Sequence, residues 1–302
     1  GENNTFLGAL AGRFNSTGDR NTIVGSQAAD NAVITGSDNT SLGFGSAHNI
    51  TSASNNVYLG ANAGFINSGS EGNVAIGSSA LYSGTGGGNV AIGKLAMQLA
   101  TSASSNIAIG YSAAGGGAMT GSGNIIMGDA AGYSITSGSN NILIGHNAGR
   151  SGSQTPQSMG AVITASNEVQ VGNESHTSYL VQVQWVANSD ARDKTDIKEH
   201  KLGLEFVNKL KPVTYYWDKR SKYENHTPDG THIEDDLQVG FLAQDLVELE
   251  KEYGHKIEDK TNLTTHKSSD GNKFGIQHTS IIPSLVKAIQ ELKAEIEILK
   301  NK

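Results

Sequence analysis

A five-residue pattern, asparagine followed by three mostly apolar residues and a glycine, recurs through the first half of the chain. It occurs nine times between Asn4 and Gly145 at intervals of 16 to 18 residues, and a degenerate tenth copy follows at 167–172. Repetition at a fixed short period is typical of a solenoid, in which each repeat buries its apolar face only against its neighbours. The apolar segment is too short for a helix and is bounded by turn formers. We therefore expect an all-β solenoid over residues 1–150.

Each repeat carries its own turn signals. The glycine can adopt positive φ, and the asparagine can close the same corner with its side chain. A coil of about 17 residues has room for two short strands and two turns. Because so thin a coil has a small core, we expect several chains to associate and share it. Close stacking of the coils is favoured by a small residue three positions after most of the glycines: Ala11, Ala28, Ala63, Ala80, Ala96, Ala113, Ala131 and Ala148.

Charge divides the chain into two unlike parts. Residues 1–150 carry 10 charged side chains, whereas residues 189–302 carry 39. The net charge of −7 and the pI near 5.7 argue against nucleic acid as a partner, because phosphate binding needs an excess of lysine and arginine. No apolar run is long enough to predict membrane insertion. The chain starts inside a repeat, without the basic start and apolar core of a signal peptide, so we expect a piece of a longer protein.

No cofactor or metal is predicted. The chain has no cysteine and therefore no thiolate zinc site. His226 and His232, with the nearby Asp235 and Asp236, lack ordered spacing on a rigid element. Hydrolysis of a glycan would need paired carboxylates, and residues 40–150 hold only two acidic side chains.

Residues 151–188 are interpreted as a bridge between the two parts. The repeat is lost in a serine-rich loop from residue 151, and residues 178–186 then alternate in the period-two pattern of a half-buried strand. That strand would carry the chain to Asn188 and Ser189.

Ser189 and Lys194 stand five residues apart where the composition changes. A serine hydroxyl becomes a nucleophile when a base removes its proton, and a lysine is such a base only if its pKa falls through burial or neighbouring cations. Arg192 would help if it points inward, whereas Asp190 and Asp193 should point elsewhere. The spacing alone is trivial, and in isolation it describes a polar loop with a solvated lysine.

The segments around this pair make it more specific. Residues 189–197, 202–217, 239–246 and a final helix beginning near 278–283 together resemble the C-terminal intramolecular chaperone, or auto-processing, domain of bacteriophage tail fibres, tail spikes and neck appendages, which also occurs in myelin regulatory factor. The resemblance implies a small α+β domain over residues 189–302 that drives three chains to fold together. It also implies a self-cleaving serine peptidase that cuts the Asn188–Ser189 bond once in its own chain, with Ser189 as nucleophile, Lys194 as its partner, and backbone N–H groups as the expected oxyanion donors.

The repeats themselves resemble the heads of trimeric autotransporter adhesins and the Gly/Asn repeats of phage tail fibres. This resemblance implies a homotrimer, as a β-roll or a triple β-helix. It specifies architecture better than function, because a plain shaft and a receptor-binding scaffold fit equally well. Turns 64–69 and 95–98 could contact a host cell-surface glycan or protein, but nothing singles them out.

The last residues form an amphipathic helix with a coiled-coil pattern. We call its apolar a and d positions the heptad seam: Ile282, Leu285, Ile289, Leu292, Ile296 and Leu299. Isoleucine at a with leucine at d alone favours two strands, but both resemblances favour three. A helix that packs only on its own domain is the alternative. Pro283 fits the first turn, and Thr279 or Ser280 could cap it.

These observations predict a viral tail fibre or appendage: a trimeric shaft that contributes to host attachment, followed by a self-releasing folding domain. We expect the shaft in the virion and the chaperone domain released in the host cytoplasm after assembly. Three rival functions stay open: a surface adhesin with a non-cleaving trimerisation domain, the distal end of a glycan-degrading tail spike, and a self-processing transcription-factor fragment.

Overall fold

The computed structural model describes residues 1–150, 164–173, 176, 180, 182, 187–224, 226–267 and 273–302. The chain divides into two compact units, Gly1–Thr177 with Ser221–His226, and Ser178–Arg220 with Thr227–Lys302. The strand predicted at 178–186 lies largely outside the described residues. Among the described residues, no helix is both long and apolar enough to cross a membrane.

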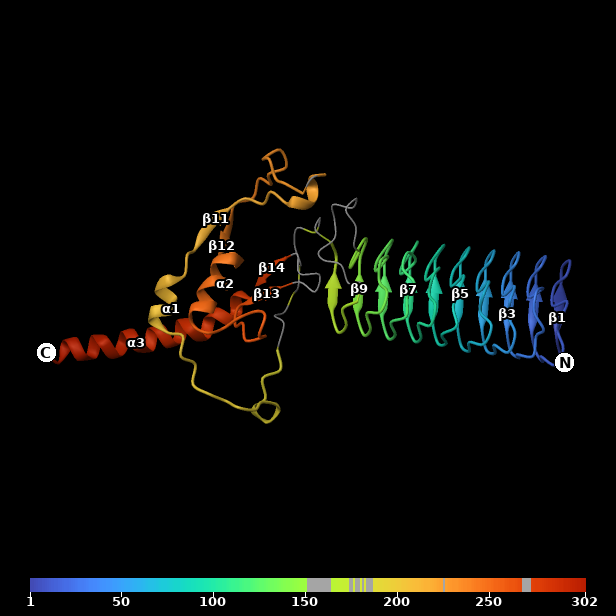
Figure 1. Ribbon diagram of the computed structural model, residues 1–302, viewed down its shortest axis with the longest axis horizontal. Coiled ribbons are helices and arrows are strands. Elements are labelled where there is room, and N and C mark those ends of the chain that lie inside the picture. The colour runs from blue at the N-terminus through green and yellow to red at the C-terminus, as the bar shows by residue number, and fades with distance from the viewer. Residues whose placement is uncertain are drawn as a thin grey trace. The chain divides into compact units, whose positions relative to one another are not determined.

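The first unit is a parallel β-solenoid, as predicted. Among the described residues it contributes ten three-residue strands, and each pairs in parallel with the next in chain order (Figure 1). The register preserves the repeat, so that Val74 lies beside Val90 and Ile76 beside Ile92. The strands are β1 (Thr5–Leu7), β2 (Thr22–Val24), β3 (Thr40–Leu42), β4 (Val57–Leu59), β5 (Val74–Ile76), β6 (Val90–Ile92), β7 (Ile107–Ile109), β8 (Ile125–Met127), β9 (Ile142–Ile144) and β10 (Val169–Val171).

The core of the solenoid is a pair of stacked columns. The middle residue of each strand from β2 to β9 points inward and is at most 1% exposed: Ile23, Ser41, Tyr58, Ala75, Ala91, Ala108, Ile126 and Leu143. The predicted small residues face it, and from Ala28 to Ala148 they are completely buried. The first and third residues of each strand therefore point away from the core, although most are apolar.

The corner glycines have the predicted conformation. After β1 to β9 their φ angles lie between 118° and 141°, a region that is essentially restricted to glycine. The coils also stack too closely for a side chain. A Cβ at Gly77 would lie 2.6 Å from the carbonyl carbon and oxygen of Gly93 in the next coil.

The asparagines bond mainly between coils and not to the glycine corner, so the predicted partner was wrong. Asn56, Asn89 and Asn106 also donate to a carbonyl two or three residues earlier in the chain. From Asn4 to Asn124, each Oδ1 accepts the backbone N–H of the next asparagine at 2.8 to 3.1 Å. Each Nδ2 donates to a carbonyl one turn further along, as Asn21 does to Gly36 at 2.9 Å. These amides, all buried from Asn21 onward, form a ladder that satisfies backbone groups in every coil.

Each described coil holds one strand, although its length leaves room for two. Beyond β1 to β10, the described coils show only two isolated bridges, Asn15 with Ile34 and Ile66 with Ser83. The reason is a turn after each corner in which two residues adopt the left-handed conformation, such as Leu95 at φ 62° and Met97 at φ 48°. An extended strand cannot pass through two such residues.

One coil contains a polar side chain at an apolar position. The Asn49 N–H donates to Phe65 O, which places Asn67 beside the buried Ile50 of the preceding coil. Asn67 is completely buried, and neither its Oδ1 nor its Nδ2 has a hydrogen-bond partner among the described residues. A buried amide without partners lowers stability.

We expect Asn67→Leu to stabilise the solenoid by about 1–3 kcal/mol, because leucine has the same branching and loses no hydrogen bond. The midpoint of urea unfolding, followed by circular dichroism, measures this. Asn73→Leu is the matched control: the same replacement in the ladder removes bonds to Asn89 and Gly86 and should lower the midpoint. Equal losses in both variants would contradict the expectation.

The second unit is a small α+β domain. Its helices are α1 (Leu204–Lys209), α2 (Ala243–Glu252) and α3 (Ile282–Lys300), with 3-10 turns η1 (Ala191–Asp193) and η3 (His278–Ile281). A further 3-10 turn, η2 (Arg220–Lys222), falls at the boundary between the two units. Strand β11 (Val213–Tyr215) pairs antiparallel with β12 (Gln238–Gly240), and β13 (Thr265–Lys267) pairs antiparallel with β14 (Phe274–Ile276). Leu202, Phe206 and Leu249 form its buried cluster.

A buried carboxylate joins α2 to β13. Glu250 is 1% exposed, and its Oε1 accepts the N–H of Thr264 at 2.6 Å and the Thr264 hydroxyl at 2.5 Å. Its Oε2 accepts the Thr265 hydroxyl at 2.7 Å. Charge-assisted bonds of this kind compensate the burial of the carboxylate and fix the strand against the helix.

Helix α3 begins with Pro283 in its first turn, as predicted, but not with the predicted cap. Ile281 is the N-cap residue and makes no side-chain capping bond, because Thr279 and Ser280 lie in η3. All six side chains of the heptad seam are between 41% and 68% exposed in the single chain. The buried face of α3 carries Ser284 and Ala288 instead.

Candidate functional site

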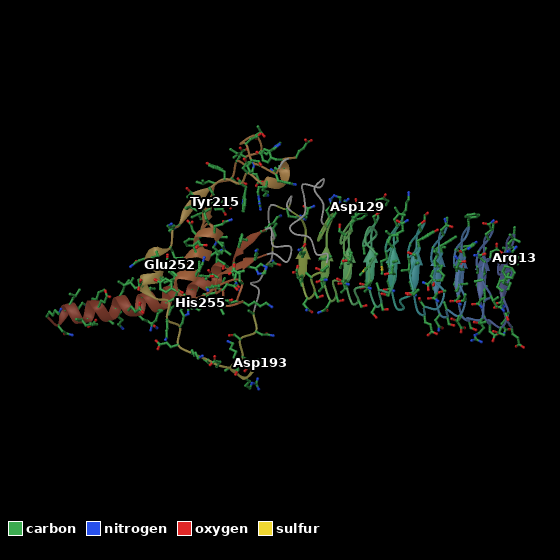
Figure 2. All side chains as sticks on the ribbon, viewed as in Figure 1. Arg13, Asp129, Asp193, Tyr215, Glu252 and His255 are labelled. Carbon is green, nitrogen blue, oxygen red and sulfur yellow. The ribbon has the colours of Figure 1, made fainter. Side chains whose placement is uncertain are left out.

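The loop that contains Ser189 is folded by a local turn. The side chain of Asp190 accepts the N–H of Arg192 at 2.9 Å, which caps η1, and the N–H of Lys194 donates to Ala191 O at 3.2 Å. Aspartate is a favoured residue for this capping role. The turn therefore returns the chain toward Ser189; Figure 2 labels Asp193 within it.

The turn brings the two predicted site residues together. Lys194 Nζ lies 2.5 Å from Ser189 Oγ and 3.4 Å from Ser189 O. This is within the distance at which an amine and a hydroxyl exchange a proton. A protonated amine donates in this contact. A neutral amine in the same place would accept the hydroxyl proton and activate the oxygen.

The neighbouring charges pair with each other. Arg192 Nη2 lies 2.6 Å from Asp190 Oδ2, and Nε lies 3.0 Å from Oδ1. These side-chain bonds, together with the bond to the Arg192 N–H, hold the pKa of Asp190 below its usual value. The Asp190 carboxylate is therefore paired with Arg192, whereas Lys194 bonds to Ser189. Arg192 does not supply the positive field that would assist the lysine, because Asp190 neutralises it.

The loop is open to solvent in the single chain. Every residue from 187 to 199 is exposed, including Asn188, Ser189 and Lys194. A lysine becomes a general base through burial or through unpaired neighbouring cations. The single chain supplies the contact between amine and hydroxyl but not the burial.

Residues 189–255 match the peptidase S74 family model, chaperone of endosialidase. This is an intramolecular-chaperone signature. The match begins at Ser189 and extends through α1, β11, β12 and α2, so the chaperone segment includes both members of the pair. The family implies a self-cleaving peptidase. It covers a minority of the 302 residues, and neither the curated proteins nor the solved structures give a significant match.

The sequence did not reveal how the loop is held downstream. Three contacts join residues 199–204 to α3, and we call them the α3 clamp. They are Lys287 Nζ with Glu199 Oε1 at 2.5 Å, His200 Nε2 with Ser284 Oγ at 2.8 Å, and the Leu204 N–H with Glu291 Oε2 at 2.7 Å. The partners are more than 80 residues apart in the chain, so no local pattern could have identified them.

No metal-binding cluster of three or more histidine or acidic side chains occurs in the part of the chain that the structure describes.

Proposed function

We propose that the chain is a fragment of a homotrimeric viral tail fibre or appendage. In this proposal the solenoid is the shaft and contributes to host attachment. The C-terminal domain is an intramolecular chaperone that drives trimerisation and then releases itself by cutting the Asn188–Ser189 bond. The observation that carries the proposal is the coincidence of the Ser189–Lys194 contact with the start of the chaperone match.

The proposed cleavage uses this pair and water, with backbone N–H groups as the expected oxyanion donors. Lys194 takes the proton of Ser189 Oγ, and the oxygen attacks the carbonyl carbon of Asn188, in the same chain or a neighbouring one. The C–N bond breaks, and the amine of Ser189 leaves with the proton from Lys194. Water then hydrolyses the Asn188 ester and restores the serine hydroxyl.

Two apolar surfaces support three-chain assembly. The outward residues of the strands include Leu42, Leu59, Ile107, Met127 and Ile144, each between 37% and 46% exposed, so they form an apolar stripe along one face of the sheet. The heptad seam of α3 is a second such surface. Contiguous exposed apolar patches mark association sites, and a seam of this pattern fits parallel helices.

Association would also complete the site. Packing of three chains around the exposed 187–199 loop would desolvate Lys194 and make it a base. Cleavage would then follow assembly, and loss of the chaperone would convert equilibrium stability into kinetic stability. A role for the shaft in host attachment is supported by exposed aromatic side chains beside the corners, such as Phe44 and Tyr111. We assign the shaft to the virion and the released domain to the host cytoplasm.

Intact and native mass measurement on purified protein tests the proposal. The expected products are residues 1–188 and 189–302, the second beginning with Ser189, and the native mass of the shaft corresponds to three chains. A trimer that stays full length after long incubation would favour the adhesin with a non-cleaving trimerisation domain. A monomer, or a cut at another bond, would refute the proposal.

A further inference from the structure

We propose that the α3 clamp positions the Ser189–Lys194 loop for cleavage, so that the terminal helix controls the reaction as well as assembly. This inference rests on the proposed function. It assigns Glu199, His200 and Glu291 as positioning residues, since none of them contacts the reacting atoms.

Helix α3 carries the clamp residues on one face and the heptad seam on another. Ser284, Lys287 and Glu291 follow the i, i+3, i+7 spacing and bind residues 199–204. The heptad seam lies on other positions of the helix and is exposed. Partner helices can therefore cover the seam while the clamp stays in place. Contacts between partner helices that hold α3 in the assembly would therefore also hold residues 199–204 through the clamp.

The clamp is close enough to the lysine to limit its position. Glu199 is five positions after Lys194, and a fully extended chain spans about 17 Å over five positions. Residues 194–199 are all exposed, so within the single chain their own burial does not hold them. The contacts at Glu199 and His200 are the first described anchors that tie this loop to α3.

Glu291 is the central member of the clamp. It accepts the N–H of Leu204, one of the free donors at the start of α1. Gly203 leaves room for the carboxylate, because a Cβ at Gly203 would collide with Glu291 Oε1 and Oε2. Gly203 has φ −113° and ψ −133°, a combination outside the regions that residues with a Cβ favour, so Gly203→Ala displaces the carboxylate and also strains the backbone. Glu291→Ala opens the same contact without this strain.

The test compares cleavage rates of trimers that carry Glu291→Ala, Glu291→Gln, Gly203→Ala or Lys287→Glu, and the exchanged pair Glu199→Lys with Lys287→Glu. Trimer fraction is measured by native mass and helix content by circular dichroism.

We expect Glu291→Ala, Gly203→Ala and Lys287→Glu to slow cleavage about tenfold or more, because misplacement of a reacting group by an ångström has effects of at least this size. Glu291→Gln still accepts the N–H, and the exchanged pair restores the ion pair, so both should recover most of the rate. Gln290→Glu, at an exposed position beside the clamp, is the matched control.

A positioning role also predicts that the plateau of the pH–rate profile falls while its midpoint stays that of the unmodified protein. Clamp variants that trimerise and cleave at the unmodified rate would overturn the inference and leave the proposed function intact. The inference would also be overturned if Glu291→Gln and the exchanged pair cleaved as slowly as Glu291→Ala and Lys287→Glu. The helix would then act only through assembly. An unmodified trimer that never cuts, or cutting that persists in Ser189→Ala, would overturn the proposed function itself.

Discussion

Ser189→Ala and Lys194→Arg are each expected to leave the assembled trimer full length, with cleavage reduced by about 10³-fold or more. The alanine removes the nucleophile. The arginine keeps the positive charge and can still donate to Ser189 Oγ, but it does not lose its proton in proteins and cannot act as a base. Intact mass after prolonged incubation of the purified trimer measures the remaining cleavage.

Lys198→Arg is the control for this experiment. Lys198 stands in the same loop and pairs with Asp196 at 2.7 Å, away from Ser189, so the same chemical change should leave cleavage unaltered. Appreciable cleavage in the Lys194→Arg trimer would show that the contact between amine and hydroxyl is structural. A block in all three variants would point to the conformation of the loop instead of proton transfer.

Gly77→Ala is expected to destabilise the solenoid by about 3 kcal/mol or more. Gly77 has φ 131°, where an alanine is strained, and the new Cβ would lie 2.6 Å from the backbone of Gly93. The backbone must move to relieve that contact. Because each coil contacts only its neighbours, we expect the damage to concentrate at the junction of β5 and β6. Hydrogen exchange of the amides in these strands, together with the urea midpoint, measures it.

Gly69→Ala is the matched control for the corner. Gly69 lies between β4 and β5, in the turn that precedes the strand of Gly77. Its φ is not in the left-handed region, and the nearest atom to an added Cβ is Ser52 Oγ at 3.6 Å. The substitution should be neutral or slightly stabilising, since it reduces the freedom of the unfolded chain. Similar midpoints for both variants would mean that the corner tolerates side chains.

The sequence predicted those features that recur locally. The corner glycine and the small residue three positions later appear in almost every repeat, and both have the predicted roles. The single strand per coil is only partly marked in the sequence. Glycine holds a left-handed position in some coils, as Gly64 and Gly132 do, whereas Leu95 and Met97 hold these positions in another. Residues with a side chain avoid this conformation, so at Leu95 and Met97 residue preference gives no sign of it.

In the candidate site, too, the local contacts could be predicted and the long-range contacts could not. Ser189 and Lys194 are near each other in sequence, and Asp190 is a recognisable cap, so a compact loop could be inferred. The α3 clamp joins residues that are far apart in the chain, and hydrogen bonds between such residues leave no pattern in a single sequence. The exposure of residues 187–199 could not be predicted from the sequence either, because it depends on which surfaces the rest of the domain covers.

The asparagine ladder allows the number of coils in the solenoid to change without loss of its hydrogen-bond pattern. Successive ladder residues are 16, 17 or 18 positions apart, yet the strands keep one register, so unequal spacing is absorbed elsewhere in the turn. Every rung presents the same donors and acceptors to the next. Duplication or loss of one complete unit by recombination would rejoin matching groups and change the length of the solenoid by a fixed step, whereas a partial unit would break the hydrogen bonds.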